Sequence, residues 1–425
     1  MGYTVKLDFG AGWQDVSSSL EGRFPVQRTR AVHKDLKPAI STCSFALVDN
    51  VAIVQAFMTA SQDVKLWVQK DAVDYFTGIV RNTHKIKVGT MYPGAHKIEG
   101  VGKWLRLAKK INFTETWSSY TVSNPASTST SVLHQLFVKA GFTLAELNLA
   151  TINITIDRAV FEATKGKTYR EVIEQLLTEF GYSAYDTASG VITLYDLGPS
   201  SITPAFTLAT GPTGNLAESY EVQRSEAKAE AVDVSWYPHE TVAGQIVFED
   251  TTGATGGLAC SIPLAAGAYY PTGADATHDI RAEFKVGDRT LVVVDSPTVV
   301  WTKTGDVVKQ VDTADGLAQR LRFYSATGGT ITKLQITGTA TLRKDKCKSI
   351  REEVVNTEKR EAIDAIWITV ADNADRTARL RANWHKYAAF EYTFPAVTLL
   401  TISPGDYVTL SDALMLGLSS TLRVV

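Results

Sequence analysis

The first hundred residues alternate apolar and polar side chains in short runs. The clearest runs are YTVKLDF, STCSFALVD, VKLWVQK, YFTGIV and HKIKVG, and polar residues, Gly or Pro separate them. Such alternation predicts strands that bury one face, and several short strands at this spacing predict a small sandwich or barrel. Gly78 stands inside YFTGIV. A glycine within a strand indicates a bulge, a bend or the close approach of another backbone.

Helical spacing appears after a Ser/Thr-rich stretch, Ser118–Ser131, which we interpret as the start of a second domain. The run VLHQLFVKAG carries apolar residues three and four positions apart, which predicts a helix. The run YSAYDTASGVITLYDL predicts a hairpin that turns near Ser189-Gly190. Residues 111–200 are therefore expected to form a small α+β domain.

A stronger helix is predicted within KTYREVIEQLLTEFG. Thr168 and Glu171 have the spacing of a capping box, in which each side chain binds the backbone of the other residue. Gly181 fits the left-handed position that ends many helices. One face of this helix is apolar throughout, and it consists of Val172, Ile173, Leu176, Leu177 and Phe180.

A long Gly/Thr-rich segment from about residue 240 to 342 has the sequence pattern of an all-β domain. Its runs include QIVFED, RAEFKVGDRTLVVVD, TVVWTKTGDVVKQV and LRFYSATGGTITKLQITGTATL, with turn signals between them. A Gly/Pro/Thr linker is predicted at Gly198–Gly214 and a strand at Glu230–Pro238. Because β-type runs also follow the segment, we interpret it as an inserted β-sandwich.

The last part of the chain begins with a helix in ADRTARLRANWHKYAA. Its spacing places Leu380, Trp384 and Ala388 inward, and it places Arg376, Arg379 and Lys386 on a neighbouring face. The runs EYTFPAVTLL and SPGDYVTL then predict strands. Pro404-Gly405 fits the central positions of a type II turn.

Charge divides the chain more sharply than its net value of -2 suggests. Residues 1–110 hold 16 Lys and Arg against 9 Asp and Glu, a net of +7, whereas residues 111–339 hold 15 against 25, a net of -10. Such blocks indicate domains with different surroundings. Apolar runs fall far short of the roughly 20 residues that span a bilayer, and the N-terminus lacks a charged leader, so we expect neither a membrane span nor a secretion signal.

Residues suited to chemistry are scattered. The three cysteines lack paired spacing, and Cys43 and Cys260 alternate with apolar residues, so we expect both in cores. The run KGKTYRE resembles part of a phosphate loop, but Phe161 stands where the first Walker glycine belongs, and Thr168 is better explained as a helix cap. Asp312 and Asp315 are better explained by a solvated turn than by a cation site.

No motif for nucleophilic or metal-assisted catalysis occurs in the sequence. Glu249 and Asp250 are adjacent in a predicted strand, so their carboxylates point to opposite faces and cannot act as an acid/base pair. We therefore expect no catalytic residues, no metal site and no cofactor. A cell-wall hydrolase would need an acid/base pair, and the sequence shows none.

Two binding hypotheses are also open. The helix with Arg376, Arg379, Arg381 and Lys386, beside Trp384 and Tyr387, could contact nucleic acid, although a solvated face over a packed one explains it better. The Gly-rich block carries the aromatic residues Tyr269, Tyr270 and Trp301, which could form a glycan platform in an adhesin or receptor-binding β protein of a virion or cell surface.

In order along the chain, these pieces resemble a tail hub protein of tailed bacteriophages, of the baseplate-hub and tail-tip family shared with contractile injection systems. The resemblance is carried by YTVKLDFGAGWQDV, HKDLKPAISTCSFALVD, YFTGIVR, GKTYREVIEQLLTEFGYSAYDTASGVITLYD, ITKLQITGTA, the helix before EYTF, and SPGDYVTL. It covers most of the chain outside Thr241 to about Gly329.

The resemblance implies a mainly β protein with a small α+β domain, two tube-like β-barrel domains and an inserted β-sandwich. The implied domains are a first hub barrel (1–110), the α+β domain (111–200), a discontinuous second barrel (201–240 and 341–425) and the insertion (241–340). Gly78 would then lie where the first sheet bends to close.

Function follows from the same resemblance. Three copies would form a ring that presents six similar barrels, joins the hexameric tail tube to the tip or spike, and lets DNA pass without sequence-specific binding. Its expected partners are itself, the tail tube or distal tail protein, the tape-measure protein and spike or fibre proteins, with host surface glycan as a further partner of the insertion. The implied location is the virion tail tip, after synthesis in the host cytoplasm.

Overall fold

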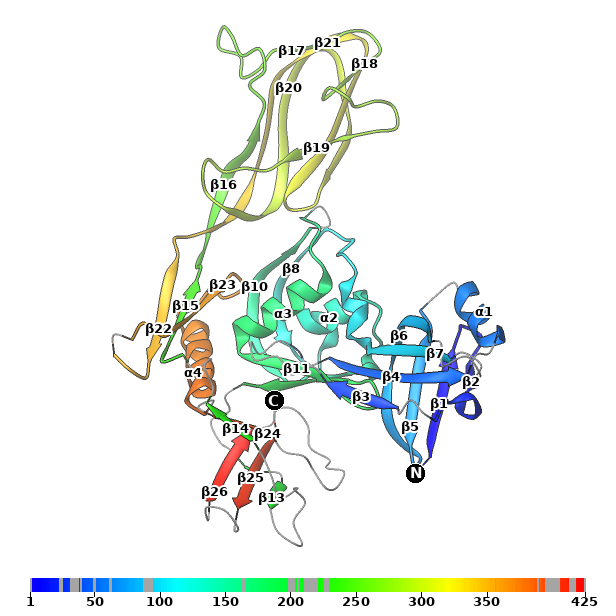
Figure 1. Cartoon of the computed structure of the whole chain (residues 1–425). Helices are drawn as coiled ribbons and strands as arrows, with labels where there is room; N and C mark the ends of the chain where they lie inside the picture. The colour runs from blue at the N-terminus through cyan, green and yellow to red at the C-terminus, as the bar shows by residue number, and fades with distance from the viewer. Residues whose placement is uncertain are drawn as a thin grey trace.

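The computed structural model (Figure 1) is mostly β-structure, as the sequence predicts. It describes residues 2–22, 26–30, 38, 40–48, 51–60, 63–86, 95–162, 165–197, 203–204, 206–209, 221–224, 229–355, 357–387, 390–393, 406–412 and 418–423. No helix in these ranges is long and apolar enough to cross a membrane. The predicted turn at Pro404-Gly405 and the greater part of the predicted linker Gly198–Gly214 lie outside them.

The first hundred residues form one antiparallel sheet of seven strands in the order β2-β1-β5-β6-β7-β4-β3. Its buried side chains alternate along the strands, and they include the predicted core residue Cys43, which is 1% exposed. The strands are β1 (Tyr3–Asp8), β2 (Trp13–Asp15), β3 (Gln27–Arg30), β4 (Ser41–Val48), β5 (Lys65–Lys70), β6 (Val73–Ile86) and β7 (Ala95–Gly102), and helix α1 (Val51–Thr59) follows β4.

Gly78 lies in β6 at a point of close approach. A Cβ atom there would lie 2.4 Å from the carbonyl oxygen of Val101 on β7 and 2.6 Å from the ring of Phe76. The Phe76 ring therefore covers the glycine on one face of the strand. A bulge between Val80 and Asn82 follows directly. Close packing thus explains the glycine.

The predicted role of Gly78 in closing a barrel is not confirmed. Within the described ranges no sheet closes on itself, because the first sheet ends at β2 and β3 and the remaining sheets are also open. All three residues of β2 are exposed, so this edge meets solvent in the single chain. Closed barrels would require strands from elsewhere.

An α+β module follows the first sheet through the short helix η2 (Lys103–Ala108). Strands β10 and β8 pair antiparallel, and β9, β11 and β12 form a second small sheet. The stretch Ser118–Ser131, predicted as the start of the domain, carries most of β8 and the short helix η3 (Thr128–Thr130). The strands are β8 (Glu115–Ser123), β9 (Leu147–Asn148), β10 (Ile152–Phe161), β11 (Tyr182–Asp186) and β12 (Ile192–Asp196).

The predicted local signals of this module are confirmed. Helix α2 (Val132–Lys139) buries Leu133, Leu136 and Phe137 completely. Helix α3 (Tyr169–Phe180) begins with the Thr168/Glu171 capping box and ends at Gly181, whose φ of 76° is left-handed. Strands β11 and β12 form the predicted hairpin, with Gly190 at a φ of 78° in its turn. Local sequence therefore specifies this region.

Three strands and one helix from the later part of the chain complete the core of the module. Strand β15 (Ala231–Trp236) pairs antiparallel with β22 (Cys347–Glu352) and parallel with β23 (Arg360–Ala365), and helix α4 (Ala371–Tyr387) packs on this sheet. Val232, Val234, Ile363 and Ala378 share one buried cluster with residues of α2 and α3. The core thus spans segments far apart in sequence.

The block between β15 and β22 is all-β and has a core of its own. Strand β21 pairs with every other strand of the block and organises it. Cys260 is fully buried in this core, as predicted, among residues that all come from the block. The strands are β16 (His239–Glu249), β17 (Ile262–Leu264), β18 (Ala268–Tyr270), β19 (Ile280–Glu283), β20 (Leu291–Ala314) and β21 (Ala318–Arg343).

Figure 1 shows the block projecting away from the first sheet and the C-terminal strands. The chain enters the block along β15 and β16 and leaves it along β21 and β22, and Thr241 pairs directly with Thr341. Arg158 of β10 forms an ion pair of 2.8 Å with Asp295 of β20, so the base of the block is also fastened to the α+β module.

Two small sheets lie near the C-terminus. Strands β13 (Phe206–Ala209), β25 (Tyr407–Asp412) and β26 (Leu418–Arg423) form one, and β14 (Glu221–Arg224) pairs with β24 (Phe390–Thr393) in the other. The runs EYTF and DYVTL therefore form strands, as predicted.

Gly78→Ala should destabilise the first sheet by about 1–3 kcal/mol, because the added methyl group overlaps backbone and ring atoms that cannot both move away. Gly22→Ala is the matched control, since a Cβ atom at Gly22 meets nothing within 4 Å. Urea unfolding followed by fluorescence would compare the two variants. Equal stability of both would contradict the close-packing account of Gly78.

Candidate functional site

The acidic turn before Gly316, predicted to be a solvated turn, is partly exposed and is held by contacts within the chain. Asp315 accepts hydrogen bonds from the N–H groups of Leu317 (3.0 Å) and Ala318 (2.8 Å) and pairs with Arg281 at 3.1 Å. Asp312 is bound by Lys309 and Gln319. The oxygens that a cation would need are already engaged by the chain.

Glu249 and Asp250 also have separate partners. The carboxylate of Glu249 accepts from Gln335, whereas Asp250 accepts from the hydroxyl of Tyr270 and from the N–H of Thr252 at 3.0 Å. The described ranges contain no group of three His, Cys, Asp or Glu residues that could hold a metal ion. Carboxylates in this block serve as acceptors inside the fold.

The segment KGKTYRE is held by backbone pairing. The N–H of Ile111 donates to the carbonyl of Lys167 at 2.9 Å, and the N–H of Tyr169 donates to the carbonyl of Lys109 at 3.1 Å. The N–H of Thr168 donates to Glu171 at 2.7 Å. The N–H groups of Thr168 and Tyr169 are therefore engaged by the chain, and the capping box of Thr168 and Glu171 confirms Thr168 as a capping residue.

The three aromatic residues of the inserted block do not form one platform. Tyr270 and Trp301 pack against the core of the block, and the Trp301 ring lies 5.1 Å from that of Phe323. Tyr269 lies instead beside Tyr324, with ring centroids 4.8 Å apart, and both side chains are partly exposed. All four side chains are partly exposed, but Tyr270 and Trp301 pack on the core of the block, whereas Tyr269 packs on Tyr324.

The buried and exposed faces of helix α4 differ in part from the prediction. Leu380 is buried and Arg379 is exposed, as predicted, but Trp384 is only partly buried. The structure describes neither the side chain of Lys386 nor residue 388. The basic face is not simply solvated, because Arg381 is 4% exposed and binds Glu361 of β23.

Arg376, the other basic residue of α4 predicted to lie in solvent, faces the α+β module. Its guanidinium donates to the carbonyl of Phe180 at 3.2 Å and to the hydroxyl of Tyr182 at 3.0 Å. The predicted helix is confirmed, but two arginines expected at the surface, Arg376 and Arg381, bind residues of other segments. A nucleic-acid surface on α4 is not supported.

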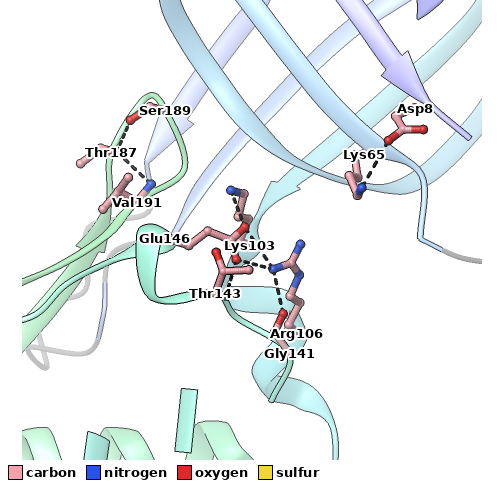
Figure 2. A network of polar contacts seen from close by, with 10 residues as sticks. All are labelled: Asp8, Lys65, Lys103, Arg106, Gly141, Thr143, Glu146, Thr187, Ser189 and Val191. Atoms are coloured by element: carbon pink, nitrogen blue, oxygen red, sulfur yellow. Dashed lines mark hydrogen bonds and ion pairs between the residues drawn. The ribbon is translucent and has the colours of Figure 1, made fainter. Parts of the chain in front are cut away.

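A network of polar contacts joins the first sheet to the α+β module (Figure 2). Lys103 and Arg106 of η2 both reach Glu146, at 2.7 and 3.1 Å, and the N–H of Thr143 donates to the same carboxylate at 2.9 Å. Burial alone would raise the pKa of Glu146, but these hydrogen bonds and charges outweigh it and hold the pKa at about 2. Glu146 is therefore ionised at every ordinary pH.

The hairpin turn of β11 and β12 packs over this network. A Cβ atom at Gly190 would lie 2.9 Å from Cε of Lys103, so the turn lies directly on the lysine side chain. Figure 2 shows the same turn at Thr187, Ser189 and Val191, and it also shows Lys65 beside Asp8 on the first sheet, at 3.3 Å. The turn therefore contacts η2 through Lys103, whose ammonium group pairs with Glu146.

Asp186 makes a second contact between the same two modules. Its carboxylate accepts from the N–H of Ser41 in β4 at 2.9 Å and is 1% exposed. A Cβ atom at Gly102 of β7 would lie 2.1 Å from the other oxygen. The glycine thus leaves room for the carboxylate at the end of the first sheet.

Glu179 of α3 connects the module to the segment before α4. It is 1% exposed, and it accepts hydrogen bonds from the N–H of Trp367 (2.7 Å) and the side chain of Gln175 (2.9 Å). Burial raises the pKa of Glu179 to about 8 although these donors lower it. Thr377 of α4 donates to the Glu179 carbonyl at 2.6 Å. The carboxyl is thus neutral near pH 7.

These contacts between modules could not be predicted from the sequence. Each of them depends on a single acidic residue that stands among ordinary surface positions along the chain. Glu179 carried the only usable signal, since it stands beside the apolar face of its helix, where a charged residue is unexpected. A buried cluster of Glu361 with Arg381 and His385, the last at 2.9 Å, follows the same pattern. Together the polar side chains position modules and assemble no reactive centre.

No protein-family model matches this sequence, and no curated protein sequence is significantly similar to it. Two solved structures share its fold over nearly the whole length. One is the 43 kDa tail protein of prophage MuSo2 from Shewanella oneidensis, which is 11% identical, with 99% of this chain and 92% of that chain covered and a TM-score of 0.50. The other is the tail protein from Neisseria meningitidis MC58, also 11% identical, with 99% and 89% covered and a TM-score of 0.50. The predicted resemblance to tail proteins is confirmed at the level of the fold.

Glu179→Gln should change how stability depends on pH. The pKa of Glu179 is about 8 in the folded chain and 4.5 as an ordinary glutamate, so the folded state binds the proton more tightly and stability falls as pH rises from about 5 to 8. At about 1.4 kcal/mol per pKa unit the natural chain should lose on the order of 3–5 kcal/mol across this range, and the glutamine variant should not.

Unfolding by urea at pH 5 and pH 9 would measure this difference. Glu174→Gln is the matched control on the same helix, because Glu174 pairs with Arg170 at the surface. Parallel pH profiles for the natural chain and Glu179→Gln would show that Glu179 is ionised in the folded state.

Proposed function

We propose that this chain is a structural protein of a phage tail hub. In this proposal three copies form a ring that joins the hexameric tail tube to the tail tip or spike and leaves a lumen through which DNA passes. The observation that supports this proposal most directly is the fold that 99% of this chain shares with two tail proteins. A match that extends over every module supports a common architecture.

The engagement of the polar residues supports a structural rather than an enzymatic role. Asp315, Thr168 and Asp250, which the sequence offered as candidates for chemistry, take part in a turn, a helix cap and a hydrogen bond inside the fold. The carboxylates of Glu146 and Asp186 accept contacts from other segments and connect modules. These contacts fix the modules relative to one another, as a load-carrying ring requires.

The four-part organisation belongs to the same proposal. The first sheet (1–110) and the discontinuous segments 201–240 and 341–425 act as the two hub barrels, residues 111–200 form the α+β domain, and residues 241–340 form the insertion. The separate core of the inserted block supports its assignment as a domain. Three copies would then offer six related sheet modules to a six-fold tube.

The proposed partners follow from this position in the tail. They are the tail tube or distal tail protein on one side, spike or fibre proteins on the other, and the tape-measure protein and DNA in the lumen, without sequence-specific contacts. The protein would be made in the host cytoplasm and reside at the virion tail tip.

A second function, glycan binding by the inserted block, is favoured by one observation. The rings of Tyr269 and Tyr324 lie 4.8 Å apart, and both side chains are partly exposed. Aromatic faces of this kind present an apolar surface next to polar groups. In this second proposal the inserted block would bind host surface glycan at a site away from the ring.

Mass measurement over a series of protein concentrations tests the ring. We expect a trimer at high concentration, because a closed ring covers the sheet edges that the single chain leaves open. The assembled tail should likewise contain three copies. A stable dimer, or a chain that stays monomeric throughout, would contradict the proposal.

Replacing Thr241–Thr339 with a short Gly/Ser linker should leave a folded remainder. The two ends of the deletion lie beside each other, since Thr241 pairs with Thr341, and the block keeps its core to itself. Circular dichroism and a cooperative melting transition would show folding. The loss of all cooperative unfolding in the deletion variant would show that the block belongs to the common core.

A further inference from the structure

Two strand edges at opposite ends of the chain are open. Strand β2 ends the first sheet, and strand β22 ends the sheet that it forms with β15 and β23. In the part of the chain that the structure describes, no strand pairs with the outer edge of either one. Figure 1 shows β2 and β22 on opposite sides of the molecule, so one copy cannot join its own two edges.

Both edges carry apolar side chains that are unusual in solvent. Trp13 of β2 is 47% exposed and lies beside Trp67, with ring centroids 6.0 Å apart. On β22, Ile350 is 53% exposed, and Val354 and Val355 directly after the strand are 49% and 76% exposed. Exposed Trp anchors and aliphatic patches are typical of protein interfaces.

The charges of the two edges are complementary. The exposed residues Lys344, Lys346 and Lys348 lead into and along β22. All three side chains of β2 are exposed, and the charged one is Asp15, which lies opposite Lys6 of β1. Hydrogen bonds from the hydroxyl and the N–H of Ser17 lower the pKa of Asp15, so it is ionised near pH 7. Strand β22 also carries Arg351 and Glu352, so the complementarity lies in the single pair of Lys348 and Asp15, and opposite charges across two strands favour their pairing.

One antiparallel register satisfies both features at once. If Trp13 lies opposite Ile350, then Gln14 lies opposite Ser349 and Asp15 opposite Lys348. Trp13 and Asp15 point to the same face of β2, and Ile350 and Lys348 point to the same face of β22, because side chains alternate along a strand. The apolar pair and the charged pair then lie next to each other.

We propose that β2 of one copy pairs antiparallel with β22 of a second copy, with Trp13 against Ile350 and Asp15 against Lys348. The inference rests on the proposed ring and names its contact. Because the two edges differ, the contact is head-to-tail, and repeated head-to-tail contacts form a ring when the rotation between copies is one third of a turn. The short pairing sets the register, and the flanking apolar residues add buried area.

A charge exchange in the full chain tests this contact. Asp15→Lys and Lys348→Asp each place like charges opposite one another and should raise the concentration at half-assembly about tenfold or more, which corresponds to 1.4 kcal/mol or more. The double variant Asp15→Lys/Lys348→Asp restores the opposite pair and should assemble like the natural chain. Sedimentation velocity over a concentration series measures all four proteins.

Trp13→Asp should also weaken assembly, whereas Val73→Asp should not, although Val73 is 67% exposed on the same sheet. Melting curves of every variant exclude unfolding as the cause. If the natural chain forms trimers and the single charge reversals leave them unchanged, the ring stands and this contact is wrong. If the natural chain never assembles, both the ring and the contact are overturned.

Discussion

A hydrophobic core that distant parts of the chain must build together is the constraint on which the structure depends. Helices α2 and α3 supply one side of this core, and β15, β23 and α4 supply another, although the inserted block separates β15 from the other two. Neither side can bury its apolar face alone. The segments after the inserted block must therefore pack against the same core as the segments before it. The polar contacts between modules fix their position in that core.

Three carboxylates at these contacts show how environment decides the charge of a group. Glu146 is partly buried beside Lys103 and Arg106 and is ionised, whereas Glu179 is fully buried without a cationic partner, and burial keeps it protonated near pH 7. Glu361 is partly buried, which by itself would raise its pKa, but His385 and Arg381 lower the pKa overall. Each carboxylate satisfies the donors around it, and a carboxylate without them would be costly to bury.

Local sequence predicted the elements but not the contacts between them. The capping box at Thr168, the hairpin of β11 and β12, and the buried Cys43 and Cys260 depend on neighbours within a few residues or on simple alternation. Glu179 and Trp367 are 188 residues apart, and no local pattern joins them. Arg381 was assigned to solvent because its partner Glu361 lies on another element, and the close packing at Gly78 depends on β7.

The strand pairs at the entry to the inserted block, β15 with β22 and β16 with β21, have a consequence for how the chain folds. Strand β15 must find β22 across more than a hundred residues, and closing a loop of that length is entropically costly and slow. The block has its own core, and once β16 and β21 have paired, Glu240 stands opposite Leu342. The search between β15 and β22 then becomes a local extension of an existing ladder. Folding should therefore proceed outward from the block, and amide hydrogens of β16, β20 and β21 should gain protection during refolding before those of β15 and β22.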